Sequence, residues 1–515
     1  MTNSENSPAT SNRVFRSYAQ RVGTAAEDAF VPAPPQPDNG DEARYSDKCG
    51  TYTKCVKQAG IGRVDLNAYQ TFRKALDSGD PADFAAIQVG GARTLNGPQG
   101  GLAFDLEGLD SSQFASPPAP ALASEAYGTE LVELYWGALL RDVAFADYDT
   151  NPVAAQAANE ISGMGTYAGP RDAANKVTPK VLFRGRFPGE TIGPYISQFL
   201  LQKTDFGGLA IDQKYMTLQA GTDYVTDPNE FQKVQNGAST GKSVMPTAPA
   251  YLYNGRGLCA YTHVDVLYQA YFIAYLVLNS MKAPFNPGNP YIGSTTQNGF
   301  NTMGQPDIAA TLTAVAAEAL KAVWYQKWYI HLRHRPESGG AIVHLIKTGQ
   351  GGTIKGQLNN NVLTSQAVQS SFTKYGTYFL SQSFPEGSPA HPAYPTGHGT
   401  VAGACITVLK YFFDGEFVIP NPQVASNDGS KLNKYTEADA GKMTVNSELH
   451  KLACNVSFGH GIHAGIHWRS DTDTSVELGE AVALSVLRDR ARTYNEKCTV
   501  SLKKLDGTIA TISNQ

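Results

Sequence analysis

A segment that opens at Pro306-Asp307 and stops before Pro336 has its apolar residues spaced as in one long α-helix. It runs for about 27 residues, which is about 40 Å at 1.5 Å per residue, and it ends where a proline disfavours helical geometry in the residue before it. Helical spacing recurs at 129–143, 262–281, 398–413, 446–468 and 474–494. Strand-like alternation is short and scarce, as at 209–224 and 499–513. The sequence therefore predicts a mostly α protein, a large helical domain with few short strands.

The first 47 residues differ from the rest of the chain in composition. Residues 1–47 are rich in Ser, Asn, Pro and Ala, which predicts a flexible N-terminal arm, and such an arm can wrap a neighbouring subunit. Beyond it, the 515-residue chain shows neither an internal repeat nor a convincing domain boundary. We therefore expect a single large helical domain over 48–515, with the chemistry-bearing motifs in 260–490.

Charge and hydropathy argue against several classes of protein. The net charge of −4 gives no electrostatic reason to expect a nucleic-acid partner. The most apolar segment, Val266 to Met281, has 16 residues, fewer than the ~20 that a membrane span needs. No secretory signal or transit peptide is readable. We expect a soluble protein without a membrane span. The sequence does not decide the cellular compartment, and it does not decide whether Cys49 and Cys55 form a disulfide.

Nine of the ten histidines lie between positions 331 and 467, and the first group of them is basic. Lys327, His331 and His334 are predicted to share one helical face, because offsets of four and seven residues return near the starting angle. Arg335 precedes a proline, so it leaves helical geometry and its guanidinium can turn toward Lys327. Lysine and arginine suit a tetrahedral oxyanion, although a solvated basic helix end is the alternative.

The second group is the turn Pro395-Thr396-Gly397-His398, which leads into an amphipathic helix. It places a hydroxyl, a glycine amide and an imidazole at a helix N-terminus, where unpaired N–H groups and the helix dipole favour an anion. His398 would then be able to exchange a proton with a bound oxyanion or its leaving group. A threonine N-cap with an incidental histidine is the alternative interpretation.

The third group is His460, His463, His467 and Asp471, at offsets of 0, 3, 7 and 11. On a helix these residues would form one narrow stripe. The His467–Asp471 spacing suits a pair in which the carboxylate accepts from one ring nitrogen and leaves the other free to bind or attack. The cluster by itself also permits a divalent metal site.

The three groups in this order resemble the vanadium-dependent haloperoxidases and their relatives, the bacterial acid phosphatases and lipid phosphatases. The resemblance is strongest to the algal and cyanobacterial bromoperoxidases and covers roughly residues 100–515. Besides the motifs, it is carried by further segments: FDLEG at 104–108, LFRG at 182–185, GPYISQ at 193–198, ALKAVWYQKW at 319–328, EGSPAHPAYPTGHGTVAGAC at 386–405 and LGEAVA at 478–483.

The resemblance implies a helical-bundle fold of the haloperoxidase and acid phosphatase type, with vanadate as cofactor between two helical bundles. By position, Lys327 and Arg335 would neutralise the vanadate oxygens, while Thr396 and the Gly397 amide would donate hydrogen bonds to them.

The histidines take distinct roles in this comparison. His398 would act as acid and base on an oxygen of the cofactor, and His467 would be the covalent ligand of vanadium, held by Asp471. His391 matches a histidine typical of bromoperoxidases, and Trp324 would line the same halide pocket. The resemblance thus implies His398, Lys327, His391 and Asp471 as catalytic residues.

The implied reaction is the oxidation of bromide and iodide by hydrogen peroxide to hypohalous acid, which halogenates a small organic substrate; chloride should be a poor substrate. Relatives form dimers or dodecamers, so we also expect a homo-oligomer. Two rivals stay open: a phosphatase in which His467 is the nucleophile, and a non-catalytic protein that binds oxyanions on the same scaffold.

Two departures from the family pattern stand out. Thr396 replaces a serine, which keeps the hydroxyl and adds a methyl group. The family also has an arginine six residues before the vanadium-binding histidine. Counting back from His467 gives Gly461, and aligning forward from Phe458-Gly459 gives His460. The arginine is absent on either count.

Histidine is the candidate replacement for this arginine. His460 or His463 would supply a charge only when a neighbouring anion raises its pKa. Asp265 matches an acidic residue that pairs with the site's cations, and it could orient such a histidine. We therefore expect vanadate binding that is weaker and more pH-dependent than in relatives.

Overall fold

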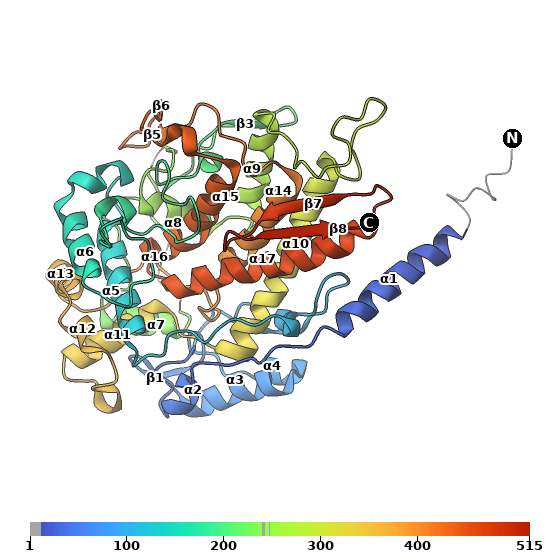
Figure 1. Cartoon of the computed structure of the whole chain (residues 1–515). Coiled ribbons are helices and arrows are strands. Elements are labelled where there is room, and N and C mark those ends of the chain that lie inside the picture. Colours follow the sequence, from blue (N-terminus) through green and yellow to red (C-terminus); the bar gives the residue numbers. More distant parts are fainter. Residues whose placement is uncertain (1–11, 239–240, 242, 247) are drawn as a thin grey trace.

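The computed structural model describes residues 12–515 except 239, 240, 242 and 247. Helices dominate, as predicted (Figure 1). The α-helices are α1 (Arg13–Ala29), α2 (Asp41–Arg44), α3 (Leu66–Ser78), α4 (Pro81–Ala85), α5 (Glu125–Leu140), α6 (Pro152–Ser162), α7 (Pro228–Gln235), α8 (Gly255–His263), α9 (Gln269–Ser280), α10 (Gln305–Tyr325), α11 (Pro336–Lys347), α12 (Asn360–Leu363), α13 (Gln366–Tyr375), α14 (Gly397–Phe412), α15 (Val445–Cys454), α16 (His460–Ala464) and α17 (Arg469–Ala491).

Tighter and wider helical turns connect these helices. The 3₁₀ turns are η2 (Pro98–Leu102), η3 (Ser111–Gln113), η4 (Phe145–Thr150), η5 (Pro179–Val181), η6 (Gln198–Leu200), η8 (Gly352–Ile354) and η9 (Ala440–Lys442). Two π-helical turns, η7 (Gln326–His331) and η10 (Asn455–Gly459), directly follow α10 and α15. Both carry residues of the predicted site or lead into them.

The strands form only short antiparallel pairs within the described residues, in agreement with the prediction. The pairs are β1 (Gln58–Gly60) with β2 (Arg63–Val64), β3 (Thr204–Phe206) with β4 (Leu209–Ile211), β5 (Gln423–Ala425) with β6 (Leu432–Lys434), and β7 (Thr499–Lys503) with β8 (Ile509–Ser513). The hairpin predicted at 499–513 has Thr499 opposite Ser513, whereas only 209–211 of the other predicted segment is a strand.

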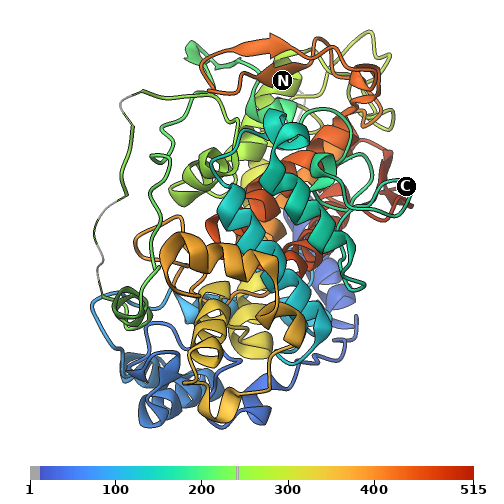
Figure 2. The ribbon, with the colours of Figure 1, turned by 90° about the vertical axis from the view of Figure 1, so that its left-hand side faces the viewer.

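Helices α10, α14 and α17 pack against one another in the middle of the body (Figure 1). A second group surrounds α5, which contacts α6, α11, α12, α13 and α16 (Figure 2). One continuous cluster of buried side chains extends from Tyr45 to Ile512 and includes residues of both groups. The site described below lies where elements of the two groups meet.

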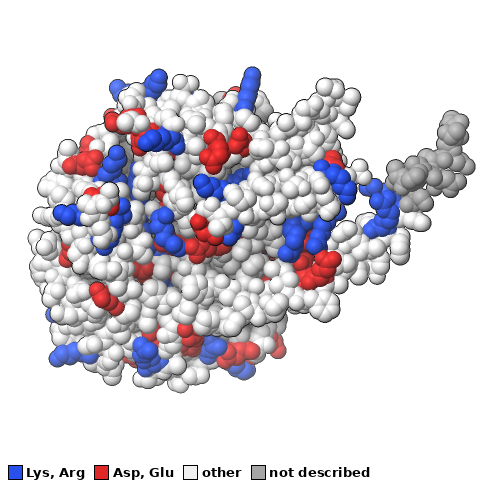
Figure 3. Space-filling view, in the orientation of Figure 1, with Lys and Arg blue, Asp and Glu red and all other residues white. Residues whose placement is uncertain are grey.

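The segment Gln305–His331, comprising α10 and η7, is the one helical stretch of the described chain with the length and apolar composition of a membrane span. Eight residues of α10 are buried against neighbouring helices, among them Ile308, Leu312 and Val315. This packing is that of a core helix. On the face shown in Figure 3, acidic and basic side chains are interspersed.

The predicted N-terminal arm contains helix α1, which points away from the body (Figures 1 and 3). Its C-terminal end is tied down by ion pairs from Arg488 to Asp28, 2.7 Å, and from Arg492 to Glu27, 2.7 Å. Residues 1–11 of the arm lie outside the described residues. The flexibility of the arm and the single-domain organisation of 48–515 stay predictions.

All six cysteines are free and buried. Cys49 and Cys55 are therefore not joined in this structure. Cys259, Cys405 and Cys454 pack as small apolar side chains.

The α14–α17 contact depends on glycines that allow close backbone approach. A Cβ atom at Gly403 would overlap the carbonyl oxygen of Val476, and one at Gly479 would overlap that of Thr400. The two helices begin side by side, where the Thr396 amide donates to the Asp471 carbonyl, 3.0 Å. Further along, Gly399 meets Ser475 and Ala404 meets Gly479, so both helices run in the same direction.

We predict that Gly403→Ala lowers the free energy of unfolding by about 1–3 kcal/mol, because the two helices must separate to admit the methyl group. Guanidinium unfolding monitored by circular dichroism measures the shift in midpoint. Gly441→Ala is the matched control, since nothing lies within 4 Å of a Cβ atom there. Equal midpoints for the two variants would contradict the prediction.

Candidate active site

A cavity of about 350 Å³ lies among most of the sequence-predicted site residues. Five separate segments build it: the turn before η2, the end of α8, the end of α10, the loop that leads into α14, and the α16–α17 region. Its lining residues are Arg93, Asn96, Thr262, His263, Asp265, Leu267, Trp324, Phe384, Glu386, Gly387, Pro389, His391, Gly397, His398, His460, Ile466 and His467.

Lys327 reaches this region from the π-helical turn η7. Its Nζ donates to the carbonyl oxygens of Pro392, 2.7 Å, and Ala393, 2.9 Å. The predicted shared face of Lys327, His331 and His334 is wrong, because η7 widens the helix and Leu332 then adopts a left-handed φ of 44°. His331 contacts Gln326 and Tyr394. His334 lies beside Tyr127 and Trp468, with its ring centroid 5.6 Å from each of theirs.

Arg335 has the extended backbone that its position before a proline predicts, with φ −80° and ψ 155°. Its guanidinium donates to His467 Nε2, 2.8 Å, and to the carbonyl oxygens of His391, 2.9 Å, and Ile466, 3.0 Å. These bonds aim the planar group at the ring nitrogen that the sequence assigns as ligand.

Lys327 and Arg335 are 0 % and 1 % exposed, and neither has a carboxylate partner among the described residues. Burial lowers the pKa of Lys327 well below its usual range, and the neighbouring Arg335 lowers it further. Burial likewise lowers the pKa of Arg335 to about 10. Two buried cations held only by carbonyl oxygens and imidazole are stabilised by an anion, which would raise both pKa values.

Helix α14 begins at the predicted anion-binding turn. Thr396 occupies the N-cap position, but its hydroxyl makes no capping bond and instead lies 3.1 Å from His467 Nε2. The alternative of a simple threonine cap therefore does not describe this residue. The hydroxyl and the Arg335 guanidinium lie at the same ring nitrogen, and Gly397, the first residue of α14, lines the cavity beside them.

His398 projects from the first turn of α14 into the cavity. Its Nε2 lies 3.0 Å from Asp265 Oδ1, and its ring centroid is 4.9 Å from that of His460. Asp265 was expected to orient the histidine that replaces the missing arginine. It instead contacts His398, so the carboxylate fixes the predicted acid–base residue.

The predicted stripe of His460, His463 and His467 is wrong, because α16 ends at Ala464 and Gly465 reverses the chain with φ 78°. His463 faces away from the cavity, with Nδ1 3.1 Å from the Gly137 carbonyl and its ring against Phe183. Within the described chain, no three His, Cys, Asp or Glu side chains converge as a metal site requires.

His460 takes the position that faces the cavity, with its ring 6.4 Å from that of His467. A Cβ atom at Gly461 would lie 2.8 Å from the His467 Cβ, so no side chain fits at the position six residues before His467. Between the two histidines weighed as replacements for the arginine, the geometry therefore leaves His460. Burial lowers its pKa well below the usual value, and nearby His398 adds to this effect.

A chain of buried polar groups fixes His467. Its Nδ1 lies 2.9 Å from Asp471 Oδ2, Arg333 donates to Asp471 Oδ1, 2.7 Å, and Arg333 also donates to Glu130, 2.9 Å. With Nδ1–H donating to the carboxylate, Nε2 carries the lone pair. Burial and the nearby Arg335 and Lys327 hold the pKa of His467 well below its usual value, so the ring is neutral.

The predicted halide pocket is also assembled. The rings of Trp324 and His391 have centroids 4.8 Å apart, and Arg335 Nη2 lies 3.1 Å from His391 Nδ1. Trp324 donates through Nε1 to the Asn96 carbonyl, 3.0 Å.

Several lining residues were missed by the sequence reasoning. His263 Nε2 lies 2.5 Å from Glu386 Oε1, and its ring stacks on Phe384 with centroids 4.0 Å apart. His263 is the one histidine outside 331–467, and it shares the cavity with His391, His398, His460 and His467. Arg93 and Asn96 come from a segment ahead of the motif-bearing region and carry no motif of their own.

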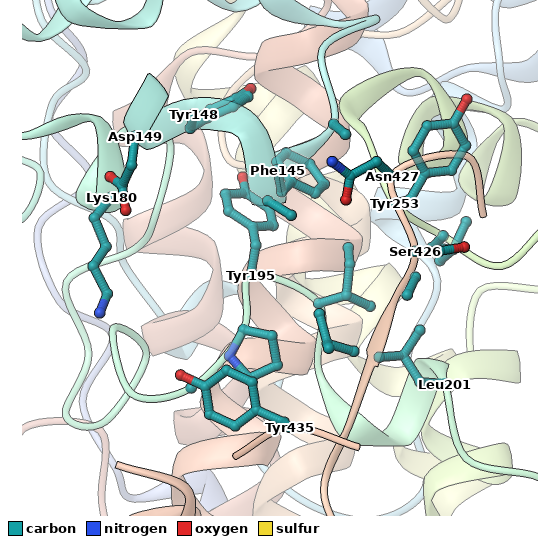
Figure 4. A pocket seen from close by; sticks show the side chains of 18 of the residues that line it. Phe145, Tyr148, Asp149, Lys180, Tyr195, Leu201, Tyr253, Ser426, Asn427 and Tyr435 are labelled. Carbon is teal, nitrogen blue, oxygen red and sulfur yellow. The ribbon is translucent and has the colours of Figure 1, made fainter. Parts of the chain in front are cut away.

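A second cavity, of about 400 Å³, lies between η4, Tyr195 and the 424–427 segment (Figure 4). Its wall mixes aromatic side chains, such as Phe145 and Tyr195, with polar and charged ones, such as Lys180 and Glu437, and it contains none of the predicted site residues. Chemistry rather than size therefore identifies the active-site candidate. Two buried cations, a hydroxyl, helix amides and a neutral imidazole with a directed lone pair suit the binding of a tetrahedral oxyanion.

The chain is similar to known proteins over most of its length. The family model described as "VCPO second helical-bundle domain" matches residues 307–496. A vanadium-dependent bromoperoxidase of Corallina officinalis is 31% identical, and the alignment covers 92% of this chain and 92% of that protein. One of Ascophyllum nodosum is 30% identical, with 92% and 87% covered. The solved structure of a homohexameric second vanadate-dependent bromoperoxidase (AnII) from Ascophyllum nodosum matches with a TM-score of 0.92 and 28% identity, covering 98% of this chain and 91% of that one.

Proposed function

The chain belongs to the vanadium-dependent bromoperoxidase family, and on this premise we propose that it oxidises bromide and iodide with hydrogen peroxide at the cavity around His467. One observation carries the proposal. Arg335, which is buried without an ion pair among the described residues, and Thr396 both contact His467 Nε2, and Lys327 is buried nearby. The hypohalous acid formed would halogenate a small organic substrate.

The residues present fit vanadate. His467 would ligate vanadium through Nε2, because Asp471 holds the proton of the ring at Nδ1. Lys327 and Arg335 would balance the charge of the oxygens, and Thr396 and the Gly397 amide would donate hydrogen bonds to them. When bound, vanadate supplies a Lewis acid that polarises peroxide, and the oxidation state of vanadium does not change.

His398 is the proposed proton carrier of the reaction. Each turnover consumes hydrogen peroxide, bromide and a proton, and yields hypobromous acid and water. Asp265 contacts His398 at Nε2, which leaves Nδ1 as the ring nitrogen for proton exchange at the cofactor. His391 and Trp324 would form the place where the halide approaches.

We also propose that α1 joins two copies of the chain. The side chains of Val14, Phe15, Tyr18 and Val22 lie on one face of α1 and are 85%, 68%, 57% and 48% exposed. A groove lined by α1 residues and the segment 104–110 lies at its base, where Phe104 is 83% exposed. An apolar helix face of this length that stays exposed among the described residues suits an identical face and groove in a second copy. A homohexameric relative of the same fold supports this assignment.

The function is tested with the vanadate-supplemented protein, hydrogen peroxide and a phenolic probe of bromination. We expect bromide and iodide to be oxidised and chloride to be oxidised poorly. His467→Ala should lower the rate by about 10³-fold, because ligand and orienting carboxylate act as a unit. His463→Asn, which changes the histidine that faces away, should keep it within about threefold.

Two outcomes would contradict this assignment. Equal or faster oxidation of chloride would overturn the halide preference. Phosphate release from an aryl phosphate in the absence of vanadate, without any bromination in its presence, would favour a phosphatase with His467 as nucleophile.

A second prediction concerns the missing arginine. Vanadate affinity should fall with rising pH between 6 and 9, because binding requires protons on groups such as Lys327 and His460 whose pKa values are low without an anion. His460→Arg should bind vanadate about tenfold more tightly at pH 8 and with a shallower pH dependence, since guanidinium stays charged. Isothermal titration calorimetry measures the vanadate affinity of both proteins at each pH. The protonation state of vanadate changes with pH in the same way for both, so it does not affect the ratio of the two affinities. Tight, flat binding by the unmodified protein would refute the prediction.

The third prediction concerns α1. Replacing Phe15 and Tyr18 together by Asp should convert the assembly to monomers, because both side chains lose their apolar contact. Light scattering after size exclusion measures the mass. Arg16→Glu, on the opposite face of α1, should leave the mass unchanged. An unaltered mass in the double variant would show that α1 does not join the copies.

A further inference from the structure

Arg93 is a cavity residue that the roles assigned so far do not use. It lies between α4 and η2, far in sequence from the motifs, and its partly exposed side chain lines the cavity together with His391, His398 and His467. Among the described residues, its guanidinium donates through Nη1 alone, to the carbonyl oxygens of Glu386, 3.1 Å, and Ser388, 3.3 Å.

A second cation already holds this loop. Lys54 Nζ donates to the same two carbonyl oxygens, of Glu386 at 2.8 Å and of Ser388 at 2.6 Å, and forms a buried ion pair with Glu337 at 2.7 Å. Lys54 is 2% exposed, so its bonds are shielded from water. The anchoring bonds of Arg93 are therefore partly redundant, and its remaining N–H groups are not needed to hold the loop.

Arg93 is also the only Lys or Arg among the described residues that line the cavity. Lys327 and Arg335 are buried behind the wall and bound to carbonyl oxygens. The lining carboxylates, Asp265 and Glu386, each contact one histidine. Arg93 forms no ion pair with a carboxylate in the part of the chain that the structure describes. Its charge acts on the nearby Glu386 carboxylate, but that carboxylate is held by His263, so the guanidinium can also act on an anion in the cavity.

Two carboxylates line the cavity that a halide would enter. Asp265 and Glu386 oppose the approach of a small anion, and a fixed cation on the same wall reverses that effect at short range. A planar guanidinium, with its charge spread over several N–H groups, suits contact with an anion.

We propose that Arg93 draws the halide into the cavity and holds it beside Trp324 and His391 before it reacts. Arg93 is thus a positioning residue for bromide and iodide, while the buried Lys327 and Arg335 serve the oxyanion. This role rests on the proposed halide oxidation, but halide binding can be measured without turnover.

Trp324 provides that measurement. It is the partly exposed tryptophan of the four, since Trp136, Trp328 and Trp468 are 0% exposed. Iodide quenches tryptophan fluorescence on contact, and acrylamide does so without charge. At constant ionic strength, Arg93→Gln should lower the quenching constant of iodide by about two- to fourfold and leave that of acrylamide unchanged. Arg93→Lys should retain iodide quenching, and so should Arg63→Gln, an exposed change outside the cavity.

Equal iodide quenching in Arg93→Gln and the unmodified protein would overturn the proposal. A parallel change in acrylamide quenching would do so too, because it would show that Arg93 merely shapes the cavity.

Steady-state kinetics give an independent readout. Arg93→Gln should raise KM for bromide by roughly three- to tenfold and change kcat less than twofold, with KM for peroxide unaffected. A loss of kcat at unchanged bromide KM would overturn the proposal. If the unmodified protein oxidises no halide while Arg93 still governs iodide quenching, the proposed function fails and the halide site stands.

Discussion

The structure is organised around two buried cations that lack a carboxylate partner. Burying an unpaired charge costs several kcal/mol, so the surrounding chain must hold Lys327 and Arg335 by other means. It does so with carbonyl oxygens of the 391–393 loop and of Ile466. The loop is in turn anchored by Lys54, and Lys54 by Glu337. Much of the polar interior thus supports one spot of positive potential beside His467.

The sequence predicted the elements well and the directions of side chains within them poorly. The long helix, the helix after Thr396 and the C-terminal hairpin are present, because periodicity and proline positions determine them locally. The two predictions of side chains sharing one helical face were wrong at η7 and at Gly465. There a π-helical turn and a left-handed glycine interrupt the 100° rotation per residue of an α-helix. The π-helical turn has no clear signature in a single sequence, whereas Gly465 is of the residue type that commonly ends a helix.

Residues that lack a motif could not be found from the sequence. Arg333 and Glu130 complete the chain that fixes His467, yet they are separated by about 200 positions and meet only in the folded protein. The contact of His398 with Asp265 was missed for the same reason, although both residues were singled out. At Gly461 a Cβ atom would lie 2.8 Å from the His467 Cβ, so an arginine at this position would require the chain around it to shift.

The parallel packing of α14 and α17 has a consequence for the range of pH in which the site keeps its character. Both helices begin at the site, so their amino-terminal peptide dipoles add there, each equivalent to about half a unit charge. Peptide groups do not titrate. In alkaline solution, where the Lys327 ammonium loses its proton, this backbone field and the Arg335 guanidinium still attract an oxyanion. The glycines that let the two helices touch therefore preserve a positive potential at the site that side-chain deprotonation does not remove.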